Sequence, residues 1–302
     1  MGAVIGSGGI CRRRCSTASR FQLDFVDLPS DDGNDVLFMS LLPHEDYSLY
    51  PESPLNDRHK LAYDWIPKGC HRLLDGGCAF GYGTRHFLDK ATEVYGIDPN
   101  KDLVAIAKAR YPQIVFQTAG LEQMPFEPEF FDVIVMNDSF EHVRDEQAVL
   151  NEAYRVLKPG GILIMTTPHR GPFTFLDPEN FVYHLRTKIP QLYRWLFRVK
   201  YGKYPGKVKP GYEELHRHYS LEDLRRKLDE SNFRDRYAID HVFRGGMLVG
   251  VLAANLFELF SVLFGMRIAN ILLKPIFWLQ RRDYFISYGI FSYNIGIRLR
   301  KR

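Results

Sequence analysis

The alternation of apolar and polar residues divides the middle of the chain into short strands and helices. Short apolar runs predict strands, and apolar residues three or four positions apart predict helices. We expect strands at 71–75, 93–98, 114–119, 130–137 and 161–168, and helices at 59–66, 83–91, 101–111 and 145–157. Because the two types alternate, the pattern predicts a parallel sheet with helices on both faces.

The second half is less regular. A helix is expected at 220–231, with Ser220 as its N-cap and the acidic Asp223 in its first turn. A strand is expected at 233–242, and a final strand at 286–300 follows a long apolar stretch. The Pro-Gly-Gly sequence within 158–161 marks the end of the preceding helix.

Composition and length favour one globular domain with extensions. The 302 residues are 45% hydrophobic and 25% charged, which is enough apolar material for a packed core. We expect a flexible N-terminal head and lead-in at 1–57 and one domain at 58–302. The first 20 residues hold four arginines and no acid, without the apolar segment of a secretory signal. An organelle-targeting peptide is the alternative interpretation of this head.

Charge and cysteine usage narrow the classes of function. A net charge of +4 gives no reason to expect a nucleic-acid partner. The four cysteines show neither Cys-x-x-Cys nor a Cys/His zinc spacing, so we expect no metal site. This cysteine usage suits a reducing compartment, so we expect a cytoplasmic protein.

A glycine-rich turn follows the first strand, in the sequence LDGGCAFGYGT at 74–84. The backbone N–H groups of such a turn bind anions, but Asp75 would repel a phosphate. A second acid, Asp98, ends the next strand, where a carboxylate accepts hydrogen bonds from ribose hydroxyls. One acid then faces an ammonium group and the other a nucleoside. S-adenosyl-L-methionine carries both.

These residues resemble motif I of the class I S-adenosylmethionine-dependent methyltransferases, Asp-x-Gly-x-Gly-x-Gly. The resemblance continues through VYGIDPN (94–100), the stretch 121–145 and YRVLKPGGILIMTTP (154–168), and more loosely through 219–242. The small-molecule branch carries Glu-His-x-x-Asp after the fourth strand, here Glu141, His142 and Asp145. The resemblance implies a Rossmann-like α/β fold: a seven-stranded, mostly parallel sheet whose last strand is antiparallel. Residues 246–282 would form a helical insertion before that strand.

The resemblance also implies the cofactor-binding residues. The turn would shape the methionine-end pocket, the acid after the second strand would hold the ribose, the loop after the third strand would lie along the adenine, and the end of the fourth strand would border the methionine. By position these are Asp75, Gly76, Gly77, Cys78, Ala79, Gly81, Asp98, Pro99, Gly120, Leu121, Glu122, Asn137 and Asp138.

Two residues depart from the family pattern. Ala79 replaces the middle glycine, and Gly120 stands where relatives often have an acid that reaches the adenine amine. These departures keep open a methyltransferase-like protein that binds without catalysis. A nucleotide-dependent oxidoreductase is the other alternative, although the turn lacks its glycine spacing.

Methyl transfer from a sulfonium is an in-line displacement, and a base is needed only for a hydroxyl or an acidic carbon. We favour oxygen as the acceptor atom, with carbon next. His142 and His169 are the preferred bases. His184, His216, His218, Tyr183 and Tyr219 are weaker candidates.

Residues 169–219 are expected to cover the acceptor site. They carry ten Lys or Arg against four Asp or Glu, a net charge of +6, mixed with aromatic residues. That composition suits a small-molecule, lipid-like or glycan-precursor acceptor with an anionic group. A solvated basic surface is the alternative.

The stretch 246–266 raises the question of a membrane. Eleven Leu, Val or Phe favour insertion, but Glu258 at the centre opposes it. We expect a helix that packs on the domain or on a second copy of the chain, as a homo-oligomer, or that lies on an anionic membrane surface. Peripheral membrane association stays open.

Overall fold

The computed structural model describes residue 55 and residues 57–302, apart from 173, 175–176, 202–203, 206–215 and 247. The predicted head at 1–57 lies outside the described residues except at its end.

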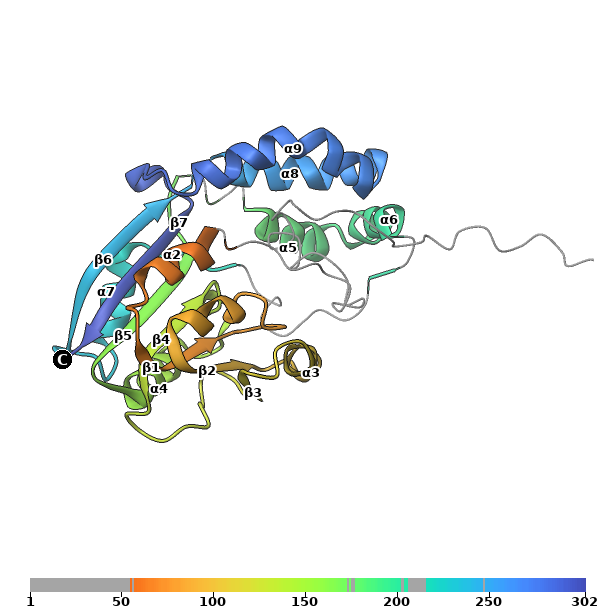
Figure 1. Ribbon diagram of the computed structural model, residues 1–302. Helices are drawn as coiled ribbons and strands as arrows, with labels where there is room; N and C mark the ends of the chain where they lie inside the picture. The colour runs from red at the N-terminus through yellow and green to blue at the C-terminus, as the bar shows by residue number, and fades with distance from the viewer. Residues whose placement is uncertain are drawn as a thin grey trace, which may run out of the picture.

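The centre of the structure is a seven-stranded sheet in the order β3-β2-β1-β4-β5-β7-β6 (Figure 1). β7 is antiparallel to both of its neighbours, and the other strands run parallel to one another. This confirms the predicted Rossmann-like α/β fold. The strands are β1 (Cys70–Gly76), β2 (Ala91–Asp98), β3 (Val115–Thr118), β4 (Phe131–Asn137), β5 (Leu157–Pro168), β6 (Tyr237–Gly245) and β7 (Asn294–Lys301).

Helices cover both faces of the sheet. One apolar cluster joins the sheet to α4 and α7, and a second joins the opposite face to α2, η2 and α3. The helices next to the sheet are α2 (Asp57–Trp65), η2 (Thr84–Asp89), α3 (Lys101–Arg110), η3 (Phe140–His142), α4 (Glu146–Val156) and α7 (Leu221–Asp229).

Side-chain caps fix where these helices begin. Asn100 accepts hydrogen bonds from the backbone of Asp102 and Leu103 at the start of α3. Ser220 and Asp223 form a reciprocal capping box at the start of α7, which confirms the predicted N-cap. Asp145, the last residue of the Glu-His-x-x-Asp motif, accepts from the N–H of Ala148 and so caps α4.

Several predicted bounds were wrong, each for a local reason. The helix at 83–91 is a short 3₁₀ helix, because β2 already begins at Ala91. α4 already ends at Val156, and the Pro-Gly-Gly sequence that was expected to stop it lies within β5, with Gly160 at φ +75°. A turn closed by the bond from Arg236 N to Phe233 O delays β6 to Tyr237.

The final strand is shorter than predicted because a 3₁₀ turn, η5 (Gly289–Phe291), precedes it, so β7 begins at Asn294. The apolar stretch before it forms two helices, α8 (Leu248–Phe264) and α9 (Met266–Asp283), separated by Gly265 at φ +82°. That φ is unfavourable for other residues, so the glycine allows the reversal.

α8 and α9 lie side by side across one end of the molecule, with α5 (Pro178–Lys188) and α6 (Pro190–Tyr201) beneath them (Figure 1). α5 and α6 lie in the stretch 169–219 that was expected to cover the acceptor site. α8 and α9 occupy the helical insertion predicted at 246–282. In the part of the chain that the structure describes, no helix has the combination of length and apolarity required to traverse a bilayer.

Candidate functional site

The turn after β1 is tied to the end of β2 by backbone hydrogen bonds. Gly77 N and Cys78 N both donate to Ile97 O, at 2.8 and 3.0 Å. The Asp98 carboxylate accepts from Ala79 N at 3.0 Å and from Asn100 N at 2.8 Å. A carboxylate has about four acceptor sites. These two bonds use two of the sites and fix the orientation of the Asp98 side chain. The two predicted acids therefore stand on neighbouring parallel strands, at the same edge of the sheet.

Two glycines of the turn are required by space as well as by φ. A Cβ on Gly77, at φ +85°, would lie 2.6 Å from the Cβ of Ser139. A Cβ on Gly81, at φ +80°, would lie 2.7 Å from the Phe116 ring. Ala79 adopts φ +46° although it has a side chain, which is a strained conformation of a kind often found at functional sites.

Asp75 is buried at the base of this turn. Its Oδ2 accepts a hydrogen bond of 2.6 Å from the Thr84 hydroxyl. Burial raises the pKa of Asp75 to about 7, against the lowering effect of Thr84 and with a smaller contribution from Asp98. A buried carboxyl with this pKa is a favourable partner for a ligand that brings its own positive charge.

The remaining predicted cofactor residues lie at or after the ends of β2, β3 and β4. β2 and β4 flank β1, and β3 lies next to β2. Leu121 is buried, and Pro99 is exposed. Glu122 Oε1 accepts from Arg144 N at 2.9 Å, so its carboxylate faces the loop before α4. The structure thus brings the predicted residues to one edge of the sheet. Their contacts with a cofactor stay a prediction.

The end of β4 is held by α2, which the sequence had not linked to the site. Arg58 Nη1 lies 2.9 Å from Asp138 Oδ2. Burial raises the pKa of Asp138, and the nearby Arg58 opposes that rise. Thr166 donates to Asp138 and Asn137, at 3.0 and 3.2 Å. The buried amide nitrogen of Asn137 makes no hydrogen bond within the described residues.

A cluster of three histidines and two carboxylates, which we call the imidazole cluster, lies beyond the end of β4, with both carboxylates buried. It comprises Glu141, His142, Asp177, His216 and His218. Asp177 Oδ2 contacts His216 Nδ1 at 2.8 Å and His218 Nε2 at 2.9 Å. His216 Nε2 lies 3.8 Å from Glu141 Oε1, and the His216 ring stacks on His142 at 5.0 Å between centroids.

The charges of the imidazole cluster are mutually compensating. Burial opposes ionisation of Asp177, but the two imidazoles outweigh it and hold the pKa of that carboxyl well below its usual value. The imidazoles of His216 and His142 likewise outweigh burial and lower the pKa of Glu141. The two carboxyls of the cluster therefore favour the ionised form beside the imidazoles.

The same donors form two trios that could hold a divalent cation, each with its ligand atoms within 4.8 Å of one another. The trios are Glu141–His142–His216 and Asp177–His216–His218. Cysteine spacing alone could not reveal this donor set. The sequence signals that could have found it were the Glu-His pair at 141–142 and the His-x-His spacing at 216–218, whereas Asp177 had no recognisable motif.

The structure separates the candidate bases. His142 belongs to the imidazole cluster, whereas His169 is buried in a backbone junction. His169 N donates to Tyr293 O, and its Nδ1 lies 2.9 Å from Ser292 O. Burial also lowers the pKa of His169. These contacts favour a structural role for His169 in joining β5 to the start of β7. His184 is exposed on α5.

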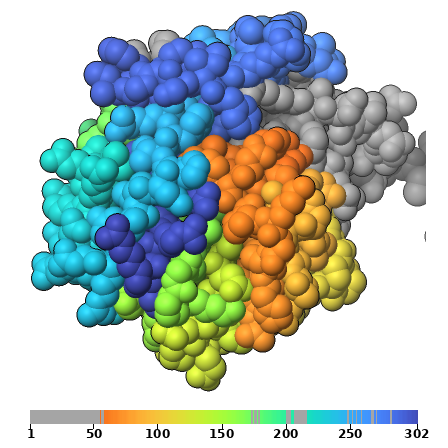
Figure 2. All heavy atoms as spheres, turned by 60° about the vertical axis from the view of Figure 1, so that its left-hand side comes forward, coloured from red at the N-terminus to blue at the C-terminus, as the bar shows by residue number. Residues whose placement is uncertain are grey.

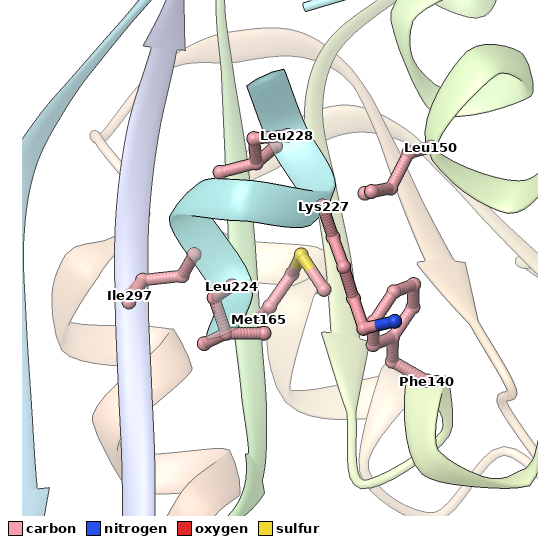
Figure 3. Close-up of a pocket in the computed structure, with 7 residues that line it drawn as sticks. All are labelled: Phe140, Leu150, Met165, Leu224, Lys227, Leu228 and Ile297. Atoms are coloured by element: carbon pink, nitrogen blue, oxygen red, sulfur yellow. The ribbon is translucent and has the colours of Figure 1, made fainter. Parts of the chain in front are cut away.

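A pocket elsewhere belongs to the packing of α7 rather than to this site (Figure 3). It lies between α7 and the sheet, and its one charged residue, Lys227, is paired with Glu146. Its lining consists of Phe140, Leu150, Met165, Leu224, Lys227, Leu228 and Ile297.

Comparisons with known proteins agree with this geometry. Residues 74–165 match the family model described as a methyltransferase domain. A probable S-adenosylmethionine-dependent methyltransferase of Mycolicibacterium smegmatis is 34% identical over 119 residues, which cover 39% of this chain and 46% of that protein. A ubiquinone biosynthesis O-methyltransferase of Pseudomonas entomophila is 30% identical over 136 residues, 41% of this chain and 57% of that protein.

Among solved structures, geranyl diphosphate methyltransferase in complex with SAM aligns with a TM-score of 0.50 at 16% identity, covering 81% of this chain and 84% of that one. This likeness concerns the fold. The chain spans about half the length of the curated relatives that it matches. The resemblance to S-adenosylmethionine-dependent methyltransferases that the motifs indicated is thereby confirmed over residues 74–165.

Proposed function

We propose that the protein is an S-adenosylmethionine-dependent methyltransferase. The observation that carries this proposal is the pair of carboxylates at the ends of β1 and β2, with the glycine turn between them. Asp75, with a pKa of about 7, suits the ammonium of the methionine end, and Asp98 suits the ribose hydroxyls. S-adenosylmethionine would supply an electrophilic methyl group there.

We infer that the imidazole cluster serves the acceptor. His216 is oriented by Asp177 and is stacked on His142, beyond the end of β4. An imidazole held in this way can remove a proton from a hydroxyl as it attacks, and the carboxylate stabilises the imidazolium that forms. His216 is therefore our preferred base, ahead of His142 and His169.

An oxygen acceptor fits this chemistry best, because sulfonium methyl transfer to oxygen needs proton removal at about the same time. One of the similar proteins is by name an O-methyltransferase. We propose an acceptor that is a small molecule, a lipid or a glycan precursor with a hydroxyl group.

The proposed cofactor is tested by calorimetry. S-adenosylhomocysteine is expected to bind with a micromolar Kd, whereas NAD should give no measurable heat at millimolar concentration. The reverse result would favour the nucleotide-dependent oxidoreductase. Binding of S-adenosylhomocysteine with no methyl transfer to any acceptor would favour the non-catalytic alternative.

Binding should also depend on pH through Asp75. Because its pKa is about 7, the ionised fraction rises from about a tenth at pH 6 to nine-tenths at pH 8, so affinity for S-adenosylhomocysteine should rise about tenfold. Without ligand the effect has the opposite sign, because the stability that the protonated form gives the fold is lost between about pH 4 and pH 7. Calorimetry at both pH values measures the change. Asp75→Asn should bind weakly and with no such slope, and a slope retained in that variant would assign it to another group.

A further inference from the structure

Exposed large apolar side chains are concentrated at one end of the molecule. Of the 21 such residues described, all except Val115 and Val242 lie at 181–204 or 252–291. These ranges contain α5, α6, α8 and α9 and the chain that follows α9, which we call the apical helices. Figure 2 shows α8 and α9 as a ridge along one end of the molecule. Exposed apolar residues concentrated on helices that pack on one another are typical of a binding surface.

The ridge is built so that one side stays apolar and exposed. α8 and α9 pack on each other through Ala253, Phe257, Ala269, Leu273 and Phe277. Leu256, Phe260 and Ile276 pack against this small core, whereas other apolar residues of the two helices are about half exposed or more. They include Leu259, Leu263, Ile268, Ile271, Trp278 and Leu279.

Cations accompany this apolar surface, and acids are scarce in it. Residues 181–204 contain six Lys or Arg and no acid, and residues 252–291 contain four Lys or Arg and two acids, Glu258 and the buried Asp283. Lys274 is exposed, and the Arg282 guanidinium lies 3.8 Å from the Trp278 ring centroid. Apolar and aromatic residues flanked by cations suit the headgroup region of an anionic bilayer. Two copies of this surface would instead repel each other.

The apical helices lie at the edge of the sheet that carries the candidate site. Pro168, at the end of β5, and Gly245, at the end of β6, both pair with Asn294. α5 and α6 follow β5, α8 follows β6, and η5 precedes β7. The surface and the carboxylates at the ends of β1 and β2 are therefore on the same side of the fold.

We propose that the apical helices dock the protein on an anionic membrane surface, with their apolar residues in the headgroup region. The surface places the candidate site close to the bilayer, so that an amphiphile can reach it without leaving the membrane. The docking proposal does not depend on the proposed methyl transfer, because it concerns only the binding of the protein to a membrane surface.

The test is vesicle flotation of the full chain. Vesicles of phosphatidylcholine with about a third phosphatidylglycerol should carry the protein, and pure phosphatidylcholine should carry about tenfold less. Ile271→Ser/Trp278→Ser and Lys274→Glu/Arg282→Glu should each lower binding about tenfold or more. The matched controls are Val115→Ser, an exposed apolar residue on β3, and Lys68→Glu/Lys108→Glu, two exposed cations outside the apical helices.

Thermal melting and affinity for S-adenosylhomocysteine should be equal in all four variants, which shows that they fold and separates docking from the proposed chemistry. No flotation of the wild type, or equal losses in the controls, would overturn the proposal. So would light scattering that shows a stable dimer dissociated by Ile271→Ser/Trp278→Ser, because a second copy would then cover the surface.

Discussion

Replacement of Asp98 by alanine is expected to weaken S-adenosylhomocysteine binding at least about a hundredfold. Two ribose hydroxyls would lose a charged acceptor, and each such hydrogen bond contributes about 1.5–3 kcal/mol. Ala79 N and Asn100 N would also lose their common acceptor, so the glycine turn would be held less firmly. Calorimetry measures the loss of affinity.

Two further variants make this result interpretable. Asp102→Ala removes an exposed acid four residues away, at the start of α3, and should leave affinity within about twofold. Asp98→Asn keeps one acceptor oxygen and should fall between the wild type and Asp98→Ala. Unchanged affinity in a folded Asp98→Ala protein would remove the ribose from this position.

The second large effect is expected at His216. His216→Ala should lower kcat about 10²- to 10⁴-fold, since it removes the proposed base. Asp177→Asn should lower kcat less and should shift the pH profile, because Asp177 orients the imidazole rather than accepting the proton itself. The measurement follows a labelled methyl group from S-adenosylmethionine into a polar-lipid extract of the source cells.

The matched control is His184→Ala, which removes an exposed histidine of α5 and should leave kcat unchanged. Dialysis against EDTA tests whether the imidazole cluster holds a cation instead. Activity that is lost to EDTA and restored by Zn²⁺ or Mn²⁺ would make His216 a ligand and not a base. Full activity of His216→Ala would show that His216 is not the base, and His142 would then be the preferred candidate.

The sequence was sufficient for the sheet and for the residues that follow its parallel strands. Strand periodicity and the order of motifs place Asp75 and Asp98 near the ends of neighbouring strands, because consecutive parallel strands end at one edge. The sequence was less informative about the bounds of helices and strands, which depend on local backbone geometry. Nothing in the sequence shows that β2 begins at Ala91 and shortens the preceding helix, or that a turn delays β6.

Long-range contacts of the site were also beyond sequence reasoning. Asp177 and His216 are 39 residues apart and meet only after α5 and α6 fold back. His169 occupied the expected position at the end of β5, but its contacts with Ser292 and Tyr293 depend on a segment more than 120 residues later. A histidine at the right edge of the sheet can thus serve the backbone rather than the acceptor.

The pairing of Arg58 with Asp138 shows that contacts of the candidate site begin before residues 74–165, the stretch that matches the family model. α2 is anchored by Ala62 and Ile66 in the sheet core and delivers a guanidinium to the end of β4. A fragment without α2 would leave the partly buried Asp138 without this counter-ion. The position of α2 therefore decides whether the end of β4 carries a paired carboxylate, and a shift of this helix would change the charge at the candidate site.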